Sequence, residues 1–298
     1  MLIFMKKEMK IIDFHVHLGD IFKQNNTFDL IGKGISYESK PNFFELIRFN
    51  NIHFGGLNHL AKPLIALKAR SICMHATFSN LKNSMELNNI SKSVVLALEP
   101  NVKSMDIINL AKLDNRTIPF CSLDPKCIDF LDRLRLYKKS GAKGVKFHPV
   151  LQNINPNSDK ALLLFDSIQK VKLPVLCHTG WDPIGISKFG SLSLFQKLVE
   201  EYPRITFIMA HLGMYEPHRA ISFGQNYSNV HFDLSWQPKG NIRMAVERLG
   251  SHRFLFGSDW PFALQTTSLD LIRAALDDKK ELGNVLYKNA AKILDLEA

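Results

Sequence analysis

The sequence has few cysteines and no long hydrophobic run. Its four cysteines, in 298 residues, form no C-x-x-C pair. A large chain with so little cysteine is not expected to depend on disulfides, and a reducing, cytoplasmic location fits. No apolar run approaches the roughly 20 residues that a membrane-spanning helix needs, so we expect no membrane association. The N-terminus also lacks the order of a secretory signal, in which basic residues precede a long apolar segment.

Nucleotide-binding motifs are missing as well. The chain contains neither G-x-G-x-x-G nor G-x-x-x-x-G-K-[ST], so a nucleotide cofactor is not indicated. The formal net charge of +10 would suit a nucleic-acid partner, but the lysines are scattered and form no dense basic block. We therefore do not expect a nucleic-acid partner, and a metal-dependent nuclease or nucleic-acid binder is kept only as a second alternative.

Apolar runs and helical stretches alternate regularly along the chain. The candidate strands and their stop signals occupy residues 11–17, 93–98, 117–123, 144–149, 174–180, 205–211, 230–235 and 253–261. Alternating strands and helices favour a parallel sheet, and eight such units predict a single α/β domain over residues 1–298, a (β/α)8 TIM-type barrel. Residues 18–70 interrupt the alternation and are predicted to be a cap or insertion after the first strand. Residues 71–88 are predicted to form one helix.

The first candidate strand ends in a pair of histidines. Asp13, His15 and His17 stand at alternate positions, so we expect all three side chains on one face. Neutral imidazole is the commonest protein ligand for zinc and similar metals. The strand therefore predicts the start of a metal-centred barrel, with the remaining ligands supplied by other strands.

Polar residues also end several of the later strands. Lys146 and His148 end the fourth strand, His178 the fifth, His211 the sixth and Asp259 the eighth. Active sites of such barrels lie at the carboxyl ends of the strands. Buried polar groups are costly unless they are paired or bound to a metal. We expect these side chains to converge on one site.

The order of these motifs resembles the amidohydrolase superfamily. The series runs from His15-x-His17 through His178-Thr179-Gly180 and His211-Leu212-Gly213 to Gly257-Ser258-Asp259-Trp260-Pro261, and the stretch from Asn289 to Leu294 is similar to the usual last helix. The most similar branch is the amidohydrolase-related group that includes aminocarboxymuconate-semialdehyde decarboxylase and many metal-dependent hydrolases. The resemblance covers nearly the whole chain from about Lys10.

The resemblance implies a metal-dependent enzyme. It makes His15, His17, His178 and Asp259 the ligands of one divalent metal, expected to be Zn²⁺, and places His211 beside the metal. Such a metal lowers the pKa of its bound water to about 7, and Asp259 or His211 accepts the proton. We therefore expect a hydrolase of a small carbonyl substrate, an amide, lactone or ester. A non-oxidative decarboxylase or lyase on the same metal site is the alternative.

The sequence leaves the role of Lys146 open and suggests further residues around the metal. Lys146 either carries a carboxylate that bridges to a second metal, or holds an anionic substrate as an ammonium, or pairs with a core acid. His148 and Trp181 are expected to line the pocket for the small-molecule substrate, and Asp233 is a candidate to orient a ligand histidine. A homodimer is the default expectation for the oligomeric state.

Overall fold

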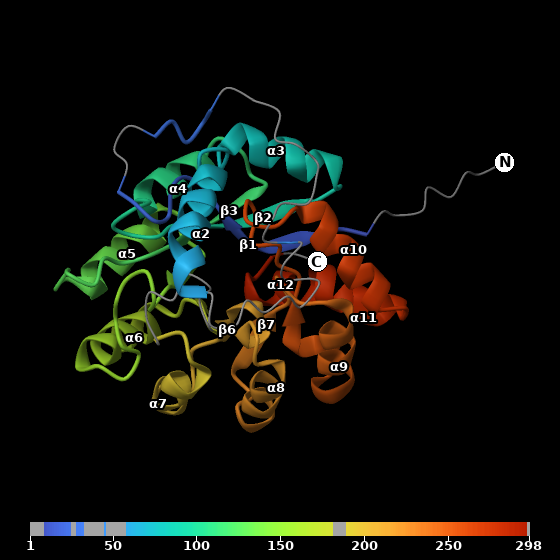
Figure 1. Ribbon diagram of the computed structural model, residues 1–298. Coiled ribbons are helices and arrows are strands. Elements are labelled where there is room, and N and C mark those ends of the chain that lie inside the picture. The colour runs from blue at the N-terminus through green and yellow to red at the C-terminus, as the bar shows by residue number, and fades with distance from the viewer. Residues whose placement is uncertain (1–8, 25–27, 33–44, 46–57, 181–188, 297–298) are drawn as a thin grey trace.

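Eight strands form one continuous parallel sheet around the centre of the molecule (Figure 1). The computed structural model describes residues 9–24, 28–32, 45, 58–180 and 189–296. The strands are β1 (Ile12–His17), β2 (Lys92–Leu96), β3 (Thr117–Cys121), β4 (Gly144–Phe147), β5 (Val175–Cys177), β6 (Phe207–Met209), β7 (Val230–Asp233) and β8 (Phe254–Leu255). All eight strands predicted from the sequence are therefore present.

The ring closes between the first strand and the segment that follows β8. Each strand pairs in parallel with the next one along the chain, from β1 to β8. Phe14 N–H donates to Phe256 O at 2.8 Å, and His17 N–H donates to Trp260 O at 2.7 Å. The sheet is thus a (β/α)8 barrel, as the sequence predicted.

Helices lie around the outside of the barrel (Figure 1). The α-helices are α2 (Asn58–Cys73), α3 (Phe78–Leu87), α4 (Ser104–Ala111), α5 (Phe130–Ser140), α6 (Asp159–Val171), α7 (Gln196–Glu201), α8 (Pro217–Asn226), α9 (Lys239–Leu249), α10 (Gln265–Ala275), α11 (Lys279–Gly283) and α12 (Asn289–Ile293). Shorter helical turns are η2 (Leu192–Phe195), η3 (Ala210–Gly213), η4 (Ser251–Arg253) and the π-helical η5 (Asn284–Lys288). Within the described residues no helix is long and apolar enough to span a membrane.

Two helices, rather than the single one expected over residues 71–88, cover this stretch. Helix α2 ends at Cys73 and α3 begins at Phe78. Thr77 separates them because its hydroxyl accepts the backbone N–H of Asn80, an N-cap bond that starts a new helix. Both helices lie between β1 and β2, and α2 overlaps the insertion predicted over residues 18–70.

The inside of the barrel is filled by one apolar cluster. Ile12, Phe14, Leu96, Phe120 and Leu176 are fully buried members of it, contributed by different strands. Each such side chain contributes about 1.5–3 kcal/mol when removed from water. The filled interior leaves polar side chains to the ends of the strands, which is where the functional site lies.

A bulge in β1 changes which of its side chains point inward. Between Asp13 and Val16 the first strand advances by three residues while β2 advances by two, from Ser93 to Val95. An extra residue of this kind shifts the alternation of side chains by one position. The expectation that Asp13 shares a face with His15 is therefore wrong.

Candidate metal centre

Side-chain atoms of His15, His17 and Asp259 form a small triangle. The two histidines are on the first strand, and Asp259 follows the last strand. His15 Nε2 lies 3.2 Å from His17 Nε2 and 3.2 Å from Asp259 Oδ1. His17 Nε2 lies 3.4 Å from the same carboxylate oxygen. Both histidines are buried. Asp259 follows β8, and the next residue, Trp260, pairs with Val16 of β1. The barrel closure therefore places residues more than two hundred positions apart in contact.

The triangle has the dimensions of a metal site. Ligand atoms about 2.1 Å from one ion are separated by about 3.4 Å at the tetrahedral angle and about 3.0 Å at a right angle. The observed separations of 3.2, 3.2 and 3.4 Å fall within this range. His211 offers a further atom within 4.8 Å of atoms of His15 and Asp259. Imidazole and carboxylate together suit a divalent transition-metal ion.

Asp233 orients the first of these histidines. It ends β7, is fully buried, and its Oδ2 lies 3.0 Å from His15 Nδ1. With that nitrogen donating to the carboxylate, the lone pair of His15 Nε2 points to the triangle. Metal-bound histidines commonly have such a carboxylate partner. The role suggested for Asp233 by the sequence therefore matches the geometry.

His178 reaches the cluster through His211. His211 Nε2 lies 3.3 Å from His178 Nδ1, and His211 Nδ1 lies 2.7 Å from the hydroxyl of Ser235. His178 Nε2 is buried and has no hydrogen-bonding partner in the part of the chain that the structure describes. Buried polar atoms without a partner are rare, so this nitrogen is a candidate to face a bound ion.

Lys146 and His148 extend the site along the end of β4. Lys146 is almost fully buried, and its Nζ lies 3.2 Å from His15 Nε2. His148 stacks on His178 with ring centroids 3.9 Å apart and planes 8° from parallel. Its backbone N–H donates to the side chain of Gln152 at 2.8 Å, which fixes the turn after the strand. Trp181, the third residue expected to line the pocket, lies outside the described residues.

Asp259 is held by a residue that sequence reasoning did not connect to it. Trp236 Nε1–H donates to Asp259 Oδ2 at 2.6 Å, which leaves Oδ1 for the triangle. Asp259 has a positive φ of 64° and Trp236 one of 62°. Such backbone angles are unfavourable for non-glycine residues and collect at functional sites. The signal in the sequence is only that Trp236 closely follows the end of an apolar strand.

Asp13 lies in a separate hydrogen-bond network. Its carboxylate accepts the backbone N–H of Ser258 at 2.9 Å, the Ser258 hydroxyl at 2.5 Å and the Gln265 amide at 2.8 Å. Burial raises the pKa of Asp13 to about 6, against the effect of these bonds. Asp13 therefore ties β1 to the segment that carries Asp259 and to α10.

The site is electrostatically suited to a cation. Burial lowers the pKa of His211 to about 4 and also lowers the pKa values of His15 and His178, so these imidazoles are neutral at pH 7. Burial by itself would raise the pKa values of Asp233 and Asp259, but the facing His15 reverses this and holds both well below their usual range. Neutral imidazoles and ionised carboxylates are the protonation states that bind metal.

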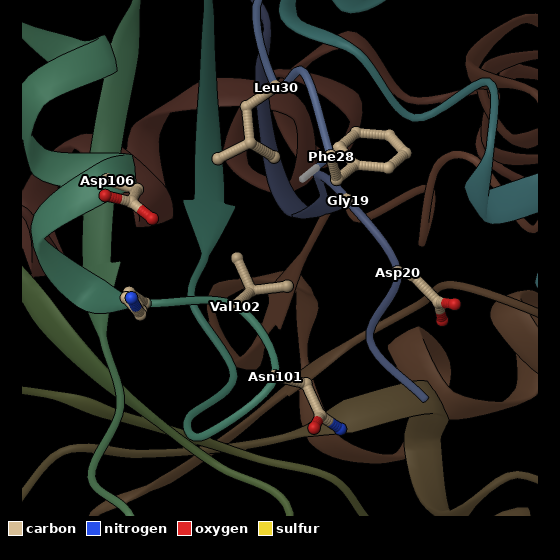
Figure 2. Close-up of a pocket in the computed structure, with 8 residues that line it drawn as sticks. Gly19, Asp20, Phe28, Leu30, Asn101, Val102 and Asp106 are labelled. Carbon is tan, nitrogen blue, oxygen red and sulfur yellow. The ribbon is translucent and has the colours of Figure 1, made fainter. Parts of the chain in front are cut away.

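A hollow lies beside the segment that follows β1. Figure 2 shows it between the segment after β1 and the loop after β2. Asp20 forms part of its lining and accepts from Arg70 Nε at 3.2 Å, while Asn101 Nδ2 donates to Ile21 O at 2.8 Å. Both polar groups are therefore engaged in holding the rim.

One comparison with known proteins identifies the family of the chain. The model of the family described as amidohydrolase matches residues 12–296. No curated protein matches the sequence. The chain is similar in structure to a 5-carboxyvanillate decarboxylase from Novosphingobium aromaticivorans, which holds manganese and 4-hydroxy-3-methoxy-5-nitrobenzoic acid; the TM-score is 0.69 at 14% identity, over 98% of this chain and 97% of that one.

Two further solved structures are similar over their full lengths. A 2,6-dihydroxybenzoate decarboxylase from Rhizobium has a TM-score of 0.68 at 12% identity, over 97% of this chain and 99% of that one. A probable 2-pyrone-4,6-dicarboxylic acid hydrolase from Acinetobacter baumannii has a TM-score of 0.60 at 14% identity, over 97% of this chain and 100% of that one. At these identities the similarity establishes the fold.

These comparisons contradict the expectation of an amide, lactone or ester hydrolase. The similar structures are mostly decarboxylases, and their TM-scores of 0.69 and 0.68 exceed the 0.60 of the hydrolase. The motifs that led to the hydrolase mark the metal site, and they do not by themselves separate hydrolysis from decarboxylation. The decarboxylase, which the sequence offered as its alternative, agrees better with the findings.

Proposed function

This chain belongs to the amidohydrolase family, and on that premise we propose that it is a metal-dependent decarboxylase of a small aromatic or unsaturated carboxylic acid. The observation that carries the proposal is the triangle of His15 Nε2, His17 Nε2 and Asp259 Oδ1, with the Lys146 ammonium beside it. The decarboxylases with similar structures support the choice of reaction.

The balance of charge supports a carboxylate substrate. Asp233 and Asp259 are buried carboxylates, and Lys146 is a buried ammonium, so the neutral-histidine site carries one net negative charge. A divalent ion changes this to one net positive charge. Since uncompensated charge in a buried site is costly, one substrate carboxylate restores neutrality. An amide or ester brings no such charge, so neutrality would then require a metal-bound hydroxide.

The chain's own residues have distinct tasks in this proposal. His15, His17, His178 and Asp259 would hold the ion, which supplies a positive charge that binds substrate oxygens and withdraws electrons. Lys146 binds the substrate carboxylate, because its ammonium lies 3.2 Å from His15 Nε2, at the edge of the triangle. Burial lowers its pKa to about 8, which still leaves it charged at pH 7.

The net reaction consumes one proton. The bond between the carboxylate and its carbon breaks, the electron pair stays on that carbon, a proton is added there, and CO₂ leaves. The proton comes from solvent through a side chain of the site. The sequence gave Asp259 and His211 as acceptors of a proton from metal-bound water, and we propose that one of these two buried groups takes up the solvent proton and passes it on.

The ion that we propose is Zn²⁺, in a single site. Three imidazoles and one carboxylate suit zinc, whereas carboxylate-rich sites suit manganese. The manganese in one of the similar structures makes Mn²⁺ the alternative. A second ion would require carboxylation of Lys146, and its Nζ is instead placed 3.2 Å from His15 Nε2.

The reaction is tested by following both products. We would load the protein with Zn²⁺ or Mn²⁺, incubate it with hydroxybenzoates and 5-carboxyvanillate in D₂O, and measure released CO₂ and deuterium at the vacated carbon. One deuterium per CO₂ supports the proposal. Ring opening of 2-pyrone-4,6-dicarboxylate without CO₂ would contradict it. In Lys146→Gln we expect KM to rise more than kcat falls, because the binding charge is lost.

A further inference from the structure

The hydrogen bonds around Asp233 have fixed directions. Its Oδ1 accepts from the backbone N–H groups of Ser235 at 3.0 Å and His211 at 3.2 Å, and from the Ser235 hydroxyl. An ionised carboxylate can only accept hydrogen bonds. The hydroxyl proton of Ser235 is therefore committed to Asp233.

This commitment determines the tautomer of His211. Ser235 Oγ lies 2.7 Å from His211 Nδ1, and its only proton already points to Asp233. The oxygen must therefore accept, so His211 carries its proton on Nδ1. The neutral ring then has a lone pair on Nε2.

The same reasoning extends to His178. His211 Nε2 lies 3.3 Å from His178 Nδ1, and a lone pair on His211 requires His178 to donate from Nδ1. The proton of His178 is then on Nδ1, and its Nε2 carries the lone pair. That atom is the buried nitrogen without a partner among the described residues.

The other oxygen of Asp233 acts on His15 directly. Oδ2 lies 3.0 Å from His15 Nδ1, so this ring also carries its proton on Nδ1. The lone pair of His15 Nε2 then faces His17 and Asp259. One carboxylate thus fixes the tautomers on both sides of the site.

We infer that Ser235 is a positioning residue of the metal centre, which passes the orienting effect of Asp233 through His211 to the ligand nitrogen of His178. The inference rests on the metal-dependent part of the proposed function. Outer partners of this kind change metal affinity by about 10-fold to 100-fold.

The tautomers can be observed in the metal-free protein. Neutral histidine in water favours the form protonated on Nε2, so the Nδ1-protonated form at three sites would be a distinctive result. We would record long-range proton–nitrogen correlations of histidine side chains and assign them with single substitutions. We expect His15, His178 and His211 to be protonated on Nδ1. An Nε2-protonated His211 in the wild type would overturn the inference.

The variant Ser235→Ala tests the relay, with His15 as an internal control. Loss of the hydroxyl should release His211 and His178 toward the Nε2-protonated form, whereas His15 keeps its direct bond to Asp233. The matched control is Ser93→Ala, a buried strand serine whose hydroxyl has no partner in the described parts of the chain. Unchanged tautomers at His211 and His178 in Ser235→Ala would contradict the relay.

Metal affinity provides a second readout. We expect Ser235→Ala to bind Zn²⁺ about tenfold more weakly than the wild type, and Ser93→Ala to bind it equally well. Equal loss in both variants would mean that Ser235 is only structural. Because the tautomers are measured without metal or substrate, a protein with these tautomers but no decarboxylation would contradict the proposed function and leave the relay intact.

Discussion

Trp236 donates to the oxygen of Asp259 that faces away from the metal triangle. Replacing it in Trp236→Phe keeps a similar ring and removes the donor. We expect about a tenfold loss of metal affinity with a small change in stability, since the carboxylate would be free to turn. Isothermal titration with Zn²⁺ measures the metal affinity, and thermal unfolding measures the stability. Unchanged affinity would show that the backbone alone orients Asp259.

His231 on β7 gives a prediction on pH. Burial, together with the nearby cations of Arg253, His252 and Lys292, lowers the pKa of His231 from 6.5 to about 4. Below pH 6.5 the unfolded chain gains a proton that the folded chain does not, so this residue lowers stability as the pH falls toward 4. The loss reaches up to about 3 kcal/mol.

Urea unfolding at several pH values tests this sign. Relative to the wild type, His231→Gln should become more stable as the pH falls from 6.5 to 4, whereas the two should converge above pH 6.5. The exposed His218 on α8 offers the control His218→Gln, which should follow the wild type. Equal stability of the wild type and His231→Gln at every pH would show that the buried ring of His231 gains its proton without a loss of stability.

Sequence reasoning found the residues of the triangle and the orienting Asp233, but not the contacts of Ser235 and Trp236. His15, His17 and Asp259 end apolar runs, and such a position is visible in the sequence. Ser235 and Trp236 act through single hydrogen bonds made possible by the turn after β7. Nothing in a serine or tryptophan by itself signals such a bond, so these contacts required the structure.

At the scale of elements, the bulge in β1 decides which side chains face the site. Simple alternation placed Asp13 with the histidines, whereas the extra residue between Asp13 and Val16 moves it out of phase. Asp13 instead bonds Ser258 and Gln265. Bulges depend on pairing with the neighbouring strand, and the sequence of one strand does not reveal them.

The segment after β8 passes so close to β1 that a side chain at position 257 would crowd its neighbours. A Cβ on Gly257 would lie 3.0 Å from His15 Cβ and 3.2 Å from Asp233 Oδ1. We expect Gly257→Ala to lower the free energy of unfolding by about 1–3 kcal/mol, since the crowded atoms must move. Metal binding should weaken as well, because both neighbours belong to the metal centre.

A second glycine provides the matched control for that change. Gly240 lies in α9, and a Cβ there would meet nothing within 4 Å. Gly240→Ala should therefore stabilise the protein by about 0.5–1 kcal/mol. Urea unfolding of both variants separates crowding from backbone entropy. Equal stability of Gly257→Ala and the wild type would contradict the close packing at this point.

At the scale of the whole molecule, the fold was predictable and the reaction was not. Eight apolar runs separated by helical stretches specify a closed parallel barrel, because burial on both faces leaves a strong signal. The reaction depends on the substrate and on the loops around it, and the metal-ligand motifs by themselves do not separate hydrolysis from decarboxylation. The sequence therefore ranked the two reactions in the wrong order.

A bound ion should also stabilise the whole barrel, because its ligands come from both ends of the chain. At a free Zn²⁺ concentration 100 times the dissociation constant, the free energy of unfolding should rise by about 2.7 kcal/mol. Thermal unfolding with Zn²⁺ and with a chelator measures the difference. An equal midpoint under both conditions would contradict a metal shared by β1 and the segment after β8.

The most direct test of the central claim is the metal content of the purified protein after reconstitution with Zn²⁺ or Mn²⁺. We would measure it by elemental analysis for the wild type, for Asp259→Ala and for His178→Ala, with Ser93→Ala as the control. The account predicts about one ion per chain in the wild type and the control, and loss of the ion in the other two. A wild type that retains no ion after reconstitution would contradict it.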